Sequence, residues 1–513
     1  MVFLGIEFGS TRIKASAIDT ETYKPVAQGS YTWASKFEGG VWTYDLSDAL
    51  EGLKIALDGV AEHDVCAVGI SGMMHGYLAF DENWELLVPF RTWQNTMTGE
   101  ATDFLFDLIN FNIPQRWSIA HLTSAAQKGE EHIPRVAHVT TLAGYVHYLL
   151  TGENAVGLNE ASGMFPIDPD TLYFDEEKLA ATDRELKKLG VPRSIKEIFP
   201  KVLPAGEVAG HLTESGAALL GGRLKAGIPF APPEGDAGTG MVATAAVSAG
   251  TGNVSAGTSV FAMIVLDKNL SRPHREIDMI TTPCGRPVAM VHCNNCTSDT
   301  NAWAAVLKES AELFGVSPDD GELYTKLYQK SLEGDADCGG ITVCNYVAGE
   351  HLTGIDSGTP LVAREPGAKF TLANFLRAQL YSTVVTLRLG MDILAEENVK
   401  ISRLTGRGGL FKTPVVGQRY LAAALGADIA CSETAGEGGP WGMALLAAYM
   451  MKKDGMTLGD FLDKKVFADV PTTVLSPCDE DVRGLNAYTE RFKKLLTVEK
   501  AAELTFNTSK TEN

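Results

Sequence analysis

Two acidic side chains in unusual settings are the first candidates for chemistry in this chain of 513 residues. Glu7 lies inside the apolar run VFLGIEF, and the turn Gly9-Ser10-Thr11 follows it directly, while Asp236 lies in the glycine-rich stretch EGDAGTG. A carboxylate in an apolar strand is costly unless it is paired or bound to a cation. A carboxylate in a cleft can accept the proton of a hydroxyl group. Glu7 is therefore a candidate ligand of Mg²⁺, acting through water, and Asp236 is a candidate general base.

Both acids also have ordinary explanations. Glu7 shares one side of its strand with Phe3 and Gly5, and that side could face solvent at the edge of a sheet. Asp236 could cap its own turn, as aspartate side chains often do. The residues alone leave these alternatives open.

Four glycine-containing turns could bind phosphate, because successive backbone N–H groups form anion-binding concavities. Gly9–Thr11 and Gly257–Ser259 join apolar segments, whereas Gly406–Gly409 and Gly436–Gly439 precede expected helices. A helix N-terminus adds a favourable dipole for an anion. One such turn is ordinary, but four beside apolar segments favour a phosphate ligand. The chain has no GxxxxGK[ST] sequence and no GxGxxG sequence after a strand, which disfavours the P-loop and dinucleotide-binding folds.

The segments SGMMHG and RTWQN supply groups that suit a sugar or a polyol. A neutral His75 and the amides of Gln94 and Asn95 can hydrogen-bond hydroxyl groups, and Trp93 can stack on a sugar ring. The simpler explanation for His75 and Trp93 is burial in a core.

Strands and helices that must position these groups follow one another along the chain. The first segment predicts a strand, a tight turn and a second strand, and Val65–Ile70 predicts another strand. Helices are expected at Ala101–Ile109, Val136–Leu150, Thr300–Leu313, Leu372–Glu396 and Thr413–Leu425. The segments EFGSTRIK and SAGTSVFA each place glycine and two hydroxyl residues between strands. This repetition predicts two halves of similar plan that share a cleft.

Composition narrows the class of protein. Lys plus Arg number 44 and Asp plus Glu 64, and the resulting net charge of −20 argues against nucleic acid or an anionic membrane as a partner. The 30 uncharged residues Ala237–Leu266 are too rich in glycine and hydroxyl residues for a membrane helix, so strands and loops are expected. Without a basic N-terminal region a signal peptide is not expected, and a cytoplasmic location is. Buried thiols are favoured over a structural metal for Cys284, Cys293 and Cys296, beside His292.

The chain resembles the FGGY carbohydrate kinases in the order and spacing of eight segments, from residue 3 to about residue 450. They are FLGIEFGSTRIKASAID, GISGMMHGYLAFD, RTWQN, ASGMFPID, GDAGTG, SAGTSVF, GRGGLFKTP and TAGEGGPWGMALLA. The resemblance implies an α/β fold of two RNase H-like (actin-like ATPase) domains with an interdomain catalytic cleft. It also implies transfer of the γ-phosphate of ATP to a hydroxyl of a ketose, such as a xylulose-like pentulose. We expect residues 1–245 to form the sugar-binding N-terminal domain, 246–490 the ATP-binding C-terminal domain, and 491–513 a polar C-terminal tail.

The resemblance also assigns residues to ligands, position by position. The nine nucleotide-binding positions are Gly9, Ser10 and Thr11 (first phosphate loop), Gly257, Thr258 and Ser259 (second phosphate loop), and Gly408, Gly409 and Thr413 (adenosine loop). The substrate positions are Met74, His75, Trp93, Asn95 and Asp236. Asp236 corresponds to the catalytic base, and Glu7 and Asp236 would hold Mg²⁺.

Four positions depart from the family pattern. Glu7 stands where the family usually has Asp, Met73 where Gln precedes the Met–His pair, Asn95 where Asp is frequent, and Met97 near a usual Arg. The departures touch the metal and sugar sites, so a sugar-binding sensor and a non-sugar ATPase of the same fold remain alternatives. The expected small-molecule partners are a sugar and ATP with Mg²⁺, without nucleic acid or membrane, and the sequence leaves a homodimer open.

Overall fold

The apolar run that holds Glu7 forms β1 (Val2–Phe8) in the computed structural model, which describes residues 1–506 apart from the side chains of Glu433 and Ala435. β1 pairs antiparallel with β2 (Arg12–Asp19) and parallel with β6 (Val65–Gly72). The turn Gly9–Thr11 joins β1 to β2, so the predicted hairpin is confirmed. The sheet has the order β13-β14-β6-β1-β2-β3, and β15 also pairs with β6. Its other strands are β3 (Pro25–Thr32), β13 (Gly210–His211), β14 (Pro229–Phe230) and β15 (Glu234–Gly235).

The two faces of β1 are buried by different helices. Leu4, Ile6 and Phe8 contribute to a core formed with α1 (Leu46–Asp58) and α4 (Leu142–Thr151). On the other face, α14 (Gly438–Lys452) packs against β1, and a Cβ on Gly5 would overlap the helix backbone at Pro440. β1 is therefore an interior strand buried on both faces, and Glu7 is only 8% exposed. The alternative that Glu7 lies on the solvated face of an edge strand is wrong.

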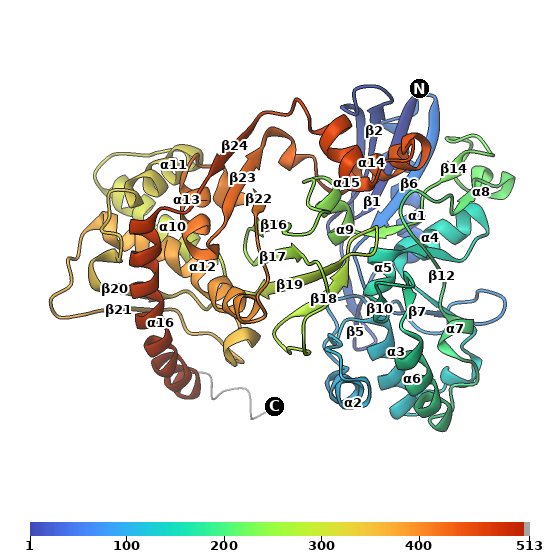
Figure 1. Cartoon of the computed structure of the whole chain (residues 1–513), viewed down its shortest axis with the longest axis horizontal. Helices are drawn as coiled ribbons and strands as arrows, with labels where there is room; N and C mark the ends of the chain where they lie inside the picture. Colours follow the sequence, from blue (N-terminus) through green and yellow to red (C-terminus); the bar gives the residue numbers. More distant parts are fainter. Residues whose placement is uncertain (507–513) are drawn as a thin grey trace. The chain divides into compact units, whose positions relative to one another are not determined.

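The chain divides into two compact units that are each built from separate segments. The first unit comprises Met1–Ala249, Val265–Ala289 and Glu437–Val470, and the second contains Gly250–Ile264, Met290–Gly436 and the chain from Pro471 onward. Our sequence-based domain boundaries, at residues 245 and 490, are continuous and do not anticipate these segments. The largest difference is α14, which lies next to β1 and β2 although it is near the other end of the sequence (Figure 1).

The second unit repeats the strand plan of the first. β16 (Thr251–Ala256) and β17 (Val260–Val265) form an antiparallel hairpin around Gly257–Ser259. β22 (Arg403–Arg407) runs parallel to β16, as β6 does to β1. The sheet continues through β23 (Asp428–Ser432) and β24 (Thr472–Leu475), with β19 (Pro287–Cys293) beside β17. The predicted repetition of a hairpin with a glycine turn is therefore present in both sheets.

The helices agree with the sequence patterns in most places. Leu372–Glu396 is helical as predicted (α12), and Thr371 caps its first turn by accepting the N–H of Asn374. Val136–Leu150 is not one helix, because His138–Thr140 forms β8 before α4 begins. The other helices of eight or more residues are α2 (Gly99–Ile109), α3 (Ser118–Gln127), α6 (Glu176–Lys188), α10 (Ser298–Leu313), α11 (Asp320–Ser331), α13 (Val416–Leu425) and α16 (Asp479–Phe506).

The shorter elements complete the description of both units. The short helices are α5 (Leu158–Ser162), α7 (Ile195–Ile198), α8 (Glu214–Leu219), α9 (Asp236–Val242) and α15 (Leu458–Phe461). The short strands are β4 (Lys36–Glu38), β5 (Val41–Thr43), β7 (Leu78–Phe80), β9 (Ala155–Gly157), β10 (Ile167–Asp168), β11 (Tyr173–Phe174), β12 (Lys201–Leu203), β18 (Asp278–Thr281), β20 (Ile341–Cys344) and β21 (Leu361–Arg364).

The predicted polar tail needs correction. Residues 491–506 form the second half of α16, and this half buries Phe492, Leu495 and Ala502 against the second unit. The polar composition of the segment conceals an apolar stripe at helical spacing. Residues 507–513 lie outside the described residues.

Candidate active site

Asp236 stands at the start of α9, directly after β15. β15 pairs with the end of β6, with Gly235 opposite Gly72. The Asp236 side chain is exposed, and its Oδ1 accepts the N–H of Met74 at 3.3 Å. The N–H of Gly238, in the first turn of α9, is instead donated to Oδ1 of Asn159 at 2.9 Å. Asn159 thus performs the local capping task that we considered for Asp236, and the Asp236 carboxylate is directed toward the Met–His pair.

Met74 and His75 follow β6 in a segment where the backbone approaches two other loops closely. A Cβ on Gly163 would lie 2.6 Å from His75 Nδ1, and a Cβ on Gly235 would lie 2.8 Å from Met74 Cγ. Glycine at both positions lets the three segments meet. His75 has φ of 75°, a conformation that costs a residue with a side chain of order 1–3 kcal/mol. Such strain is typical of functional sites, and three predicted motifs converge here.

The surroundings of His75 determine its protonation state. Burial and the nearby Arg116 guanidinium hold the pKa of His75 well below its usual range, so the imidazole is neutral. Its Nδ1 lies 3.3 Å from the carbonyl oxygen of Gly163, which can only accept, so Nδ1 carries the hydrogen. Nε2 is then an acceptor and suits the hydroxyl group of a polyol or sugar. Arg116, which forms an ion pair with Asp278, was not predicted from the sequence.

Two buried carboxylic acids lie close to Asp236, and neither was predicted from the sequence. Burial raises the pKa of Glu234 to about 8, and Glu234 Oε2 accepts the N–H of Glu160 at 3.0 Å. Burial raises the pKa of Glu160 well above its usual range, and the negative charge of Asp236 adds to this shift. Both acids therefore hold protons near neutral pH. For Glu160 the signal in the sequence is an acid among uncharged residues, in NEASG, whereas Glu234 has Asp236 two residues away in PPEGD and lacks that signal.

The segment RTWQN lies beside the Met–His segment, because Arg91 and Tyr77 exchange backbone hydrogen bonds of 2.8 and 3.2 Å. Trp93 is 42% exposed, so the alternative that it is a core residue is wrong. Asn95 is buried, and its Nδ2 donates to the carbonyls of Trp42 and Thr92 at 2.8 and 3.0 Å. Both amide hydrogens are thus engaged by backbone, and Oδ1 already accepts the N–H of Trp42 at 2.8 Å, which leaves one oxygen lone pair for any ligand. The predicted contact of Asn95 with a sugar stays a prediction.

Glu7 and the first glycine turn lie together at the end of β1. Glu7 Oε2 lies 3.4 Å from Nζ of Lys14, its partner across the hairpin, and a Cβ on Gly439 would overlap Oε1. The carboxylate therefore lies against the first turn of α14, where the helix dipole favours an anion. In the turn itself, Ser10 and Thr11 are exposed.

Two aromatic side chains donate hydrogen bonds to backbone carbonyls of the first glycine turn. Trp33 Nε1 donates to the carbonyl of Gly9 at 2.7 Å, and the Tyr44 hydroxyl donates to the carbonyl of Ser10 at 2.8 Å. The two rings pack on each other with centroids 4.4 Å apart. With its carbonyls held in this way, the turn keeps a fixed shape at the surface, which is what a phosphate loop requires.

The second unit brings the other two predicted loops together. The Gly257 N–H donates to the carbonyl of Ser259 at 2.9 Å, and Thr258 is exposed. Gly408 has φ of 101°, and a Cβ there would overlap the carbonyl oxygen of Ala256, the last residue before the turn. Gly408 and Gly409 are exposed, whereas Thr413 is buried. The predicted roles of all three residues in binding adenosine stay predictions.

The cysteine cluster and the uncharged run gave two further expectations. Cys293 and Cys296 are fully buried, and burial raises the pKa of Cys296 to about 12, as expected for inert thiols, whereas Cys284 is only partly buried. Within residues 1–506, no three His, Cys, Asp or Glu side chains are arranged to hold a metal ion. β16 and β17 confirm the strands expected in the uncharged run, but its first residues belong to the helix α9, which was not expected. None of the helices in the described part of the chain is long and apolar enough to cross a membrane.

The comparisons with known proteins agree with this geometry. The N-terminal domain model of the FGGY family of carbohydrate kinases matches residues 2–243, and the C-terminal domain model matches residues 252–451. A xylulose kinase of Haemophilus influenzae is 23% identical over 457 residues, which covers 84% of this chain and 87% of that protein. Two crystal structures from Lactobacillus acidophilus show the same fold at 16% identity. A ligand-bound xylulose kinase has a TM-score of 0.79, and a gluconate kinase has one of 0.78, each covering 98% of this chain and 99% of the other.

Proposed function

The chain belongs to the FGGY family of carbohydrate kinases and is an ATP-dependent sugar kinase with the two-domain actin-like ATPase fold. From this premise we propose that it phosphorylates a hydroxyl of a ketose. The observation that carries the proposal is the hydrogen bond between Asp236 and the N–H of Met74, which joins the acid to the Met–His pair. The xylulose kinase of Haemophilus influenzae supports a xylulose-like pentulose as the acceptor. The similar fold of a gluconate kinase means that the fold by itself does not select the acceptor.

His75 and Trp93 would bind the acceptor. The neutral imidazole of His75 offers Nε2 to a hydroxyl hydrogen, and the exposed indole of Trp93 offers a flat apolar surface to a sugar ring. Met74 is buried against Gly163 and Gly235, so it fixes the backbone that carries His75 and receives the Asp236 hydrogen bond.

Asp236 would act as the general base. The acceptor oxygen attacks the γ-phosphorus, the bond from that phosphorus to the β–γ bridging oxygen breaks, ADP leaves with that electron pair, and Asp236 takes the hydroxyl proton. Glu160 and Glu234 hold protons near neutral pH, so neither competes as a base. A protonated pair behind the base also avoids a cluster of three negative charges, which burial would make costly.

The glycine turns would bind the nucleotide. Gly257–Ser259 and Gly408–Gly409 are neighbours in the second unit, which suits two parts of one ligand, the phosphates and the adenosine. Gly9–Thr11, in the first unit, is a turn of the same phosphate-binding kind. Backbone N–H groups in turns that do not rearrange are well suited to stabilise developing negative charge.

Mg²⁺ fits the residues at the end of β6. Glu7 is opposite Ser71 on one side of this strand, and Gly235, which precedes Asp236, is opposite Gly72 on its other side. Carboxylates that leave room for water are the sites Mg²⁺ prefers. When bound, the ion would neutralise phosphate charge. Glu7 and Asp236 would hold it through water, and Lys14 keeps the Glu7 carboxylate in place.

A screen of acceptors tests the proposal. The purified chain is incubated with ATP, Mg²⁺ and one compound from a panel of pentuloses, hexuloses, heptuloses, polyols and sugar acids. ADP release and the mass of the product are then measured. The proposal predicts a sugar phosphate and ADP in equal amounts with at least one ketose. Sugar binding without ADP release would instead indicate a sensor, and ADP release that no sugar stimulates would indicate a non-sugar ATPase. We further propose a cytoplasmic location, where ATP is available, and leave a homodimer open.

A further inference from the structure

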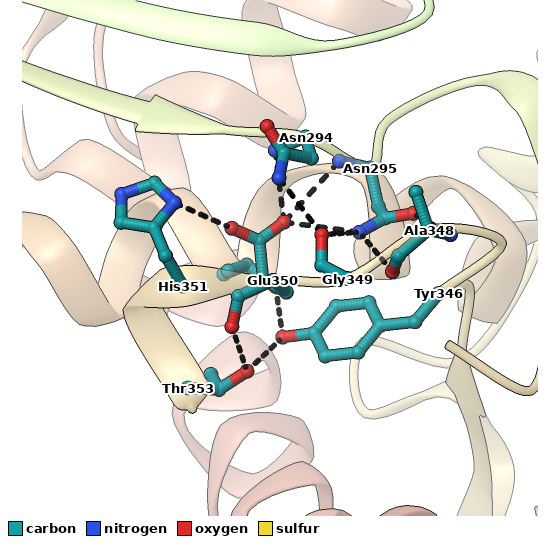
Figure 2. A network of polar contacts seen from close by, with 9 residues as sticks. Asn294, Asn295, Tyr346, Ala348, Gly349, Glu350, His351 and Thr353 are labelled. Atoms are coloured by element: carbon teal, nitrogen blue, oxygen red, sulfur yellow. Dashed lines mark hydrogen bonds and ion pairs between the residues drawn. The ribbon is translucent and has the colours of Figure 1, made fainter. Parts of the chain in front are cut away.

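A buried carboxylate in the second unit organises the chain next to the second glycine turn. Glu350 is fully buried, and its Oε2 accepts the backbone N–H groups of Asn294 and Asn295 at 2.9 and 3.2 Å. It also accepts Nδ2 of Asn295 at 3.1 Å, so three donors converge on one oxygen (Figure 2). Hydrogen bonds to a charged acceptor are stronger than neutral ones.

Asn295 extends this attachment to the loop that precedes Glu350. Its Oδ1 accepts the N–H groups of Val347 and Ala348 at 2.9 and 3.0 Å, and its Nδ2 donates to the carbonyl of Ala348 at 3.1 Å. Asn294 Nδ2 donates to the carbonyl of Gly349 at 2.8 Å. The loop and the Asn294–Asn295 segment therefore form one hydrogen-bonded unit (Figure 2).

The two residues that follow this segment hold the glycine turn. The Cys296 N–H donates to the carbonyl of Thr258 at 2.9 Å. The N–H and hydroxyl of Thr297 both donate to the carbonyl of Gly257, at 3.1 and 2.8 Å. The carbonyls of this turn therefore accept hydrogen bonds from neighbouring residues, as the carbonyls of the first turn do from Trp33 and Tyr44. The two residues that donate to Glu350, Asn294 and Asn295, directly precede the two that donate to the turn.

The chemistry of Glu350 suits this task better than a neutral side chain. Burial raises the pKa of Glu350, while Asn295 and the backbone N–H groups favour the charged form. His351 Nδ1 lies 3.7 Å from the second carboxylate oxygen, Oε1. Losing the carboxylate would remove the acceptor of two backbone N–H groups, and that of Asn295 is buried, which is costly.

We infer that Glu350 is a positioning residue for ATP: it fixes Asn294–Thr297 and thereby the orientation of the Gly257–Ser259 turn that would bind the phosphates. The inference rests on the proposed function and adds to it a residue that need not touch either substrate. Glu350 should therefore affect the affinity for nucleotide and not that for the sugar.

The experiment compares Glu350→Gln and Glu350→Ala with the wild-type chain. Gln keeps an oxygen that can accept the same hydrogen bonds but lacks the charge, whereas Ala removes the acceptor. We expect the KM for ATP to rise about tenfold or more in Glu350→Ala and roughly threefold in Glu350→Gln. The KM for the acceptor should stay within twofold. Calorimetric titration with Mg·ADP should show the same order of weakening without any need for turnover.

Glu499→Gln is the matched control, because Glu499 is another fully buried carboxylate of the second unit and accepts the N–H of Thr359 at 2.5 Å. This variant should alter thermal unfolding without changing the KM for ATP. If Glu350→Ala does not fold, Glu350→Gln decides the test.

Two results would overturn the inference. One is an unchanged affinity for Mg·ADP in both Glu350 variants, and the other is an equal change of both KM values. The failure of the proposed function looks different, because the wild-type chain would then phosphorylate no acceptor or bind no nucleotide at all.

Discussion

Glu234 makes the stability of the first unit depend on pH, and Glu234→Gln should remove that dependence. Burial raises the pKa of Glu234 from 4.5 to about 8 in the folded chain. The folded state thus keeps a proton that the unfolded state loses near pH 4.5. The resulting stabilisation is fully present below the unfolded pKa and is lost as the pH rises through the folded pKa.

The size of the effect follows from the two pKa values. Between pH 5 and pH 8, the wild-type chain should lose about 3 kcal/mol that a neutral Gln would keep. For a unit of this size, about 3 kcal/mol corresponds to a difference in Tm of roughly 6 °C. The Gln amide has the shape of the protonated acid, and its oxygen can still accept the Glu160 N–H that Glu234 now accepts.

Scanning calorimetry at pH 5 and pH 8 measures this difference. We expect similar Tm values for Glu234→Gln and the wild-type chain at pH 5, and a Tm about 6 °C higher for the variant at pH 8. Glu62→Gln, at an exposed position of the first unit, is the control and should behave as wild type at both pH values. Parallel pH dependence in the wild-type chain and Glu234→Gln would refute the reasoning that Glu234 is buried as a neutral acid.

Three further substitutions test the loops and the acceptor site. Gly408→Ala places a Cβ against the Ala256 carbonyl and is strained by its positive φ. The KM for ATP should therefore rise at least about tenfold in steady-state assays, and an unchanged KM would contradict the role of Gly408 in binding adenosine. Gly439→Ala displaces the Glu7 carboxylate, so half-maximal activity should require several times more Mg²⁺, and an identical Mg²⁺ titration would argue against Glu7 as a ligand. Trp93→Ala should weaken acceptor binding about fivefold without lowering Tm, because the indole is half exposed, and unaltered binding would exclude stacking.

Sequence patterns predicted the strands and helices that depend on residues close together in the sequence. β1, the turn Gly9–Thr11 and β2 were predicted because a glycine and two hydroxyl residues separate two apolar runs. The helix Leu372–Glu396 was predicted with its bounds, and in the structure Thr371 caps its first turn. In contrast, the packing of α14 on β1 depends on contacts between residues more than 400 positions apart, which no local pattern contains.

In the candidate site too, some residues were predicted from local sequence and others could not be. Met74, His75 and Asp236 were predicted, and the structure places them together. Glu160 and Arg116 were missed, because their roles depend on what surrounds them after folding. A buried Glu and a solvated Glu look alike in a sequence, and only the folded chain shows that Glu160 is buried beside Asp236. The same holds for Glu350, whose three donors come from a segment 55 positions away or more.

The most direct test of the account is the turnover of Asp236→Asn, measured as transfer of radiolabelled γ-phosphate from ATP to the preferred ketose. If Asp236 is the base, kcat should fall by about 10²- to 10⁴-fold, while the affinity for the ketose, measured by calorimetry without nucleotide, should stay near that of the wild-type chain. Turnover within a fewfold of wild type would contradict the assignment of Asp236 as the base.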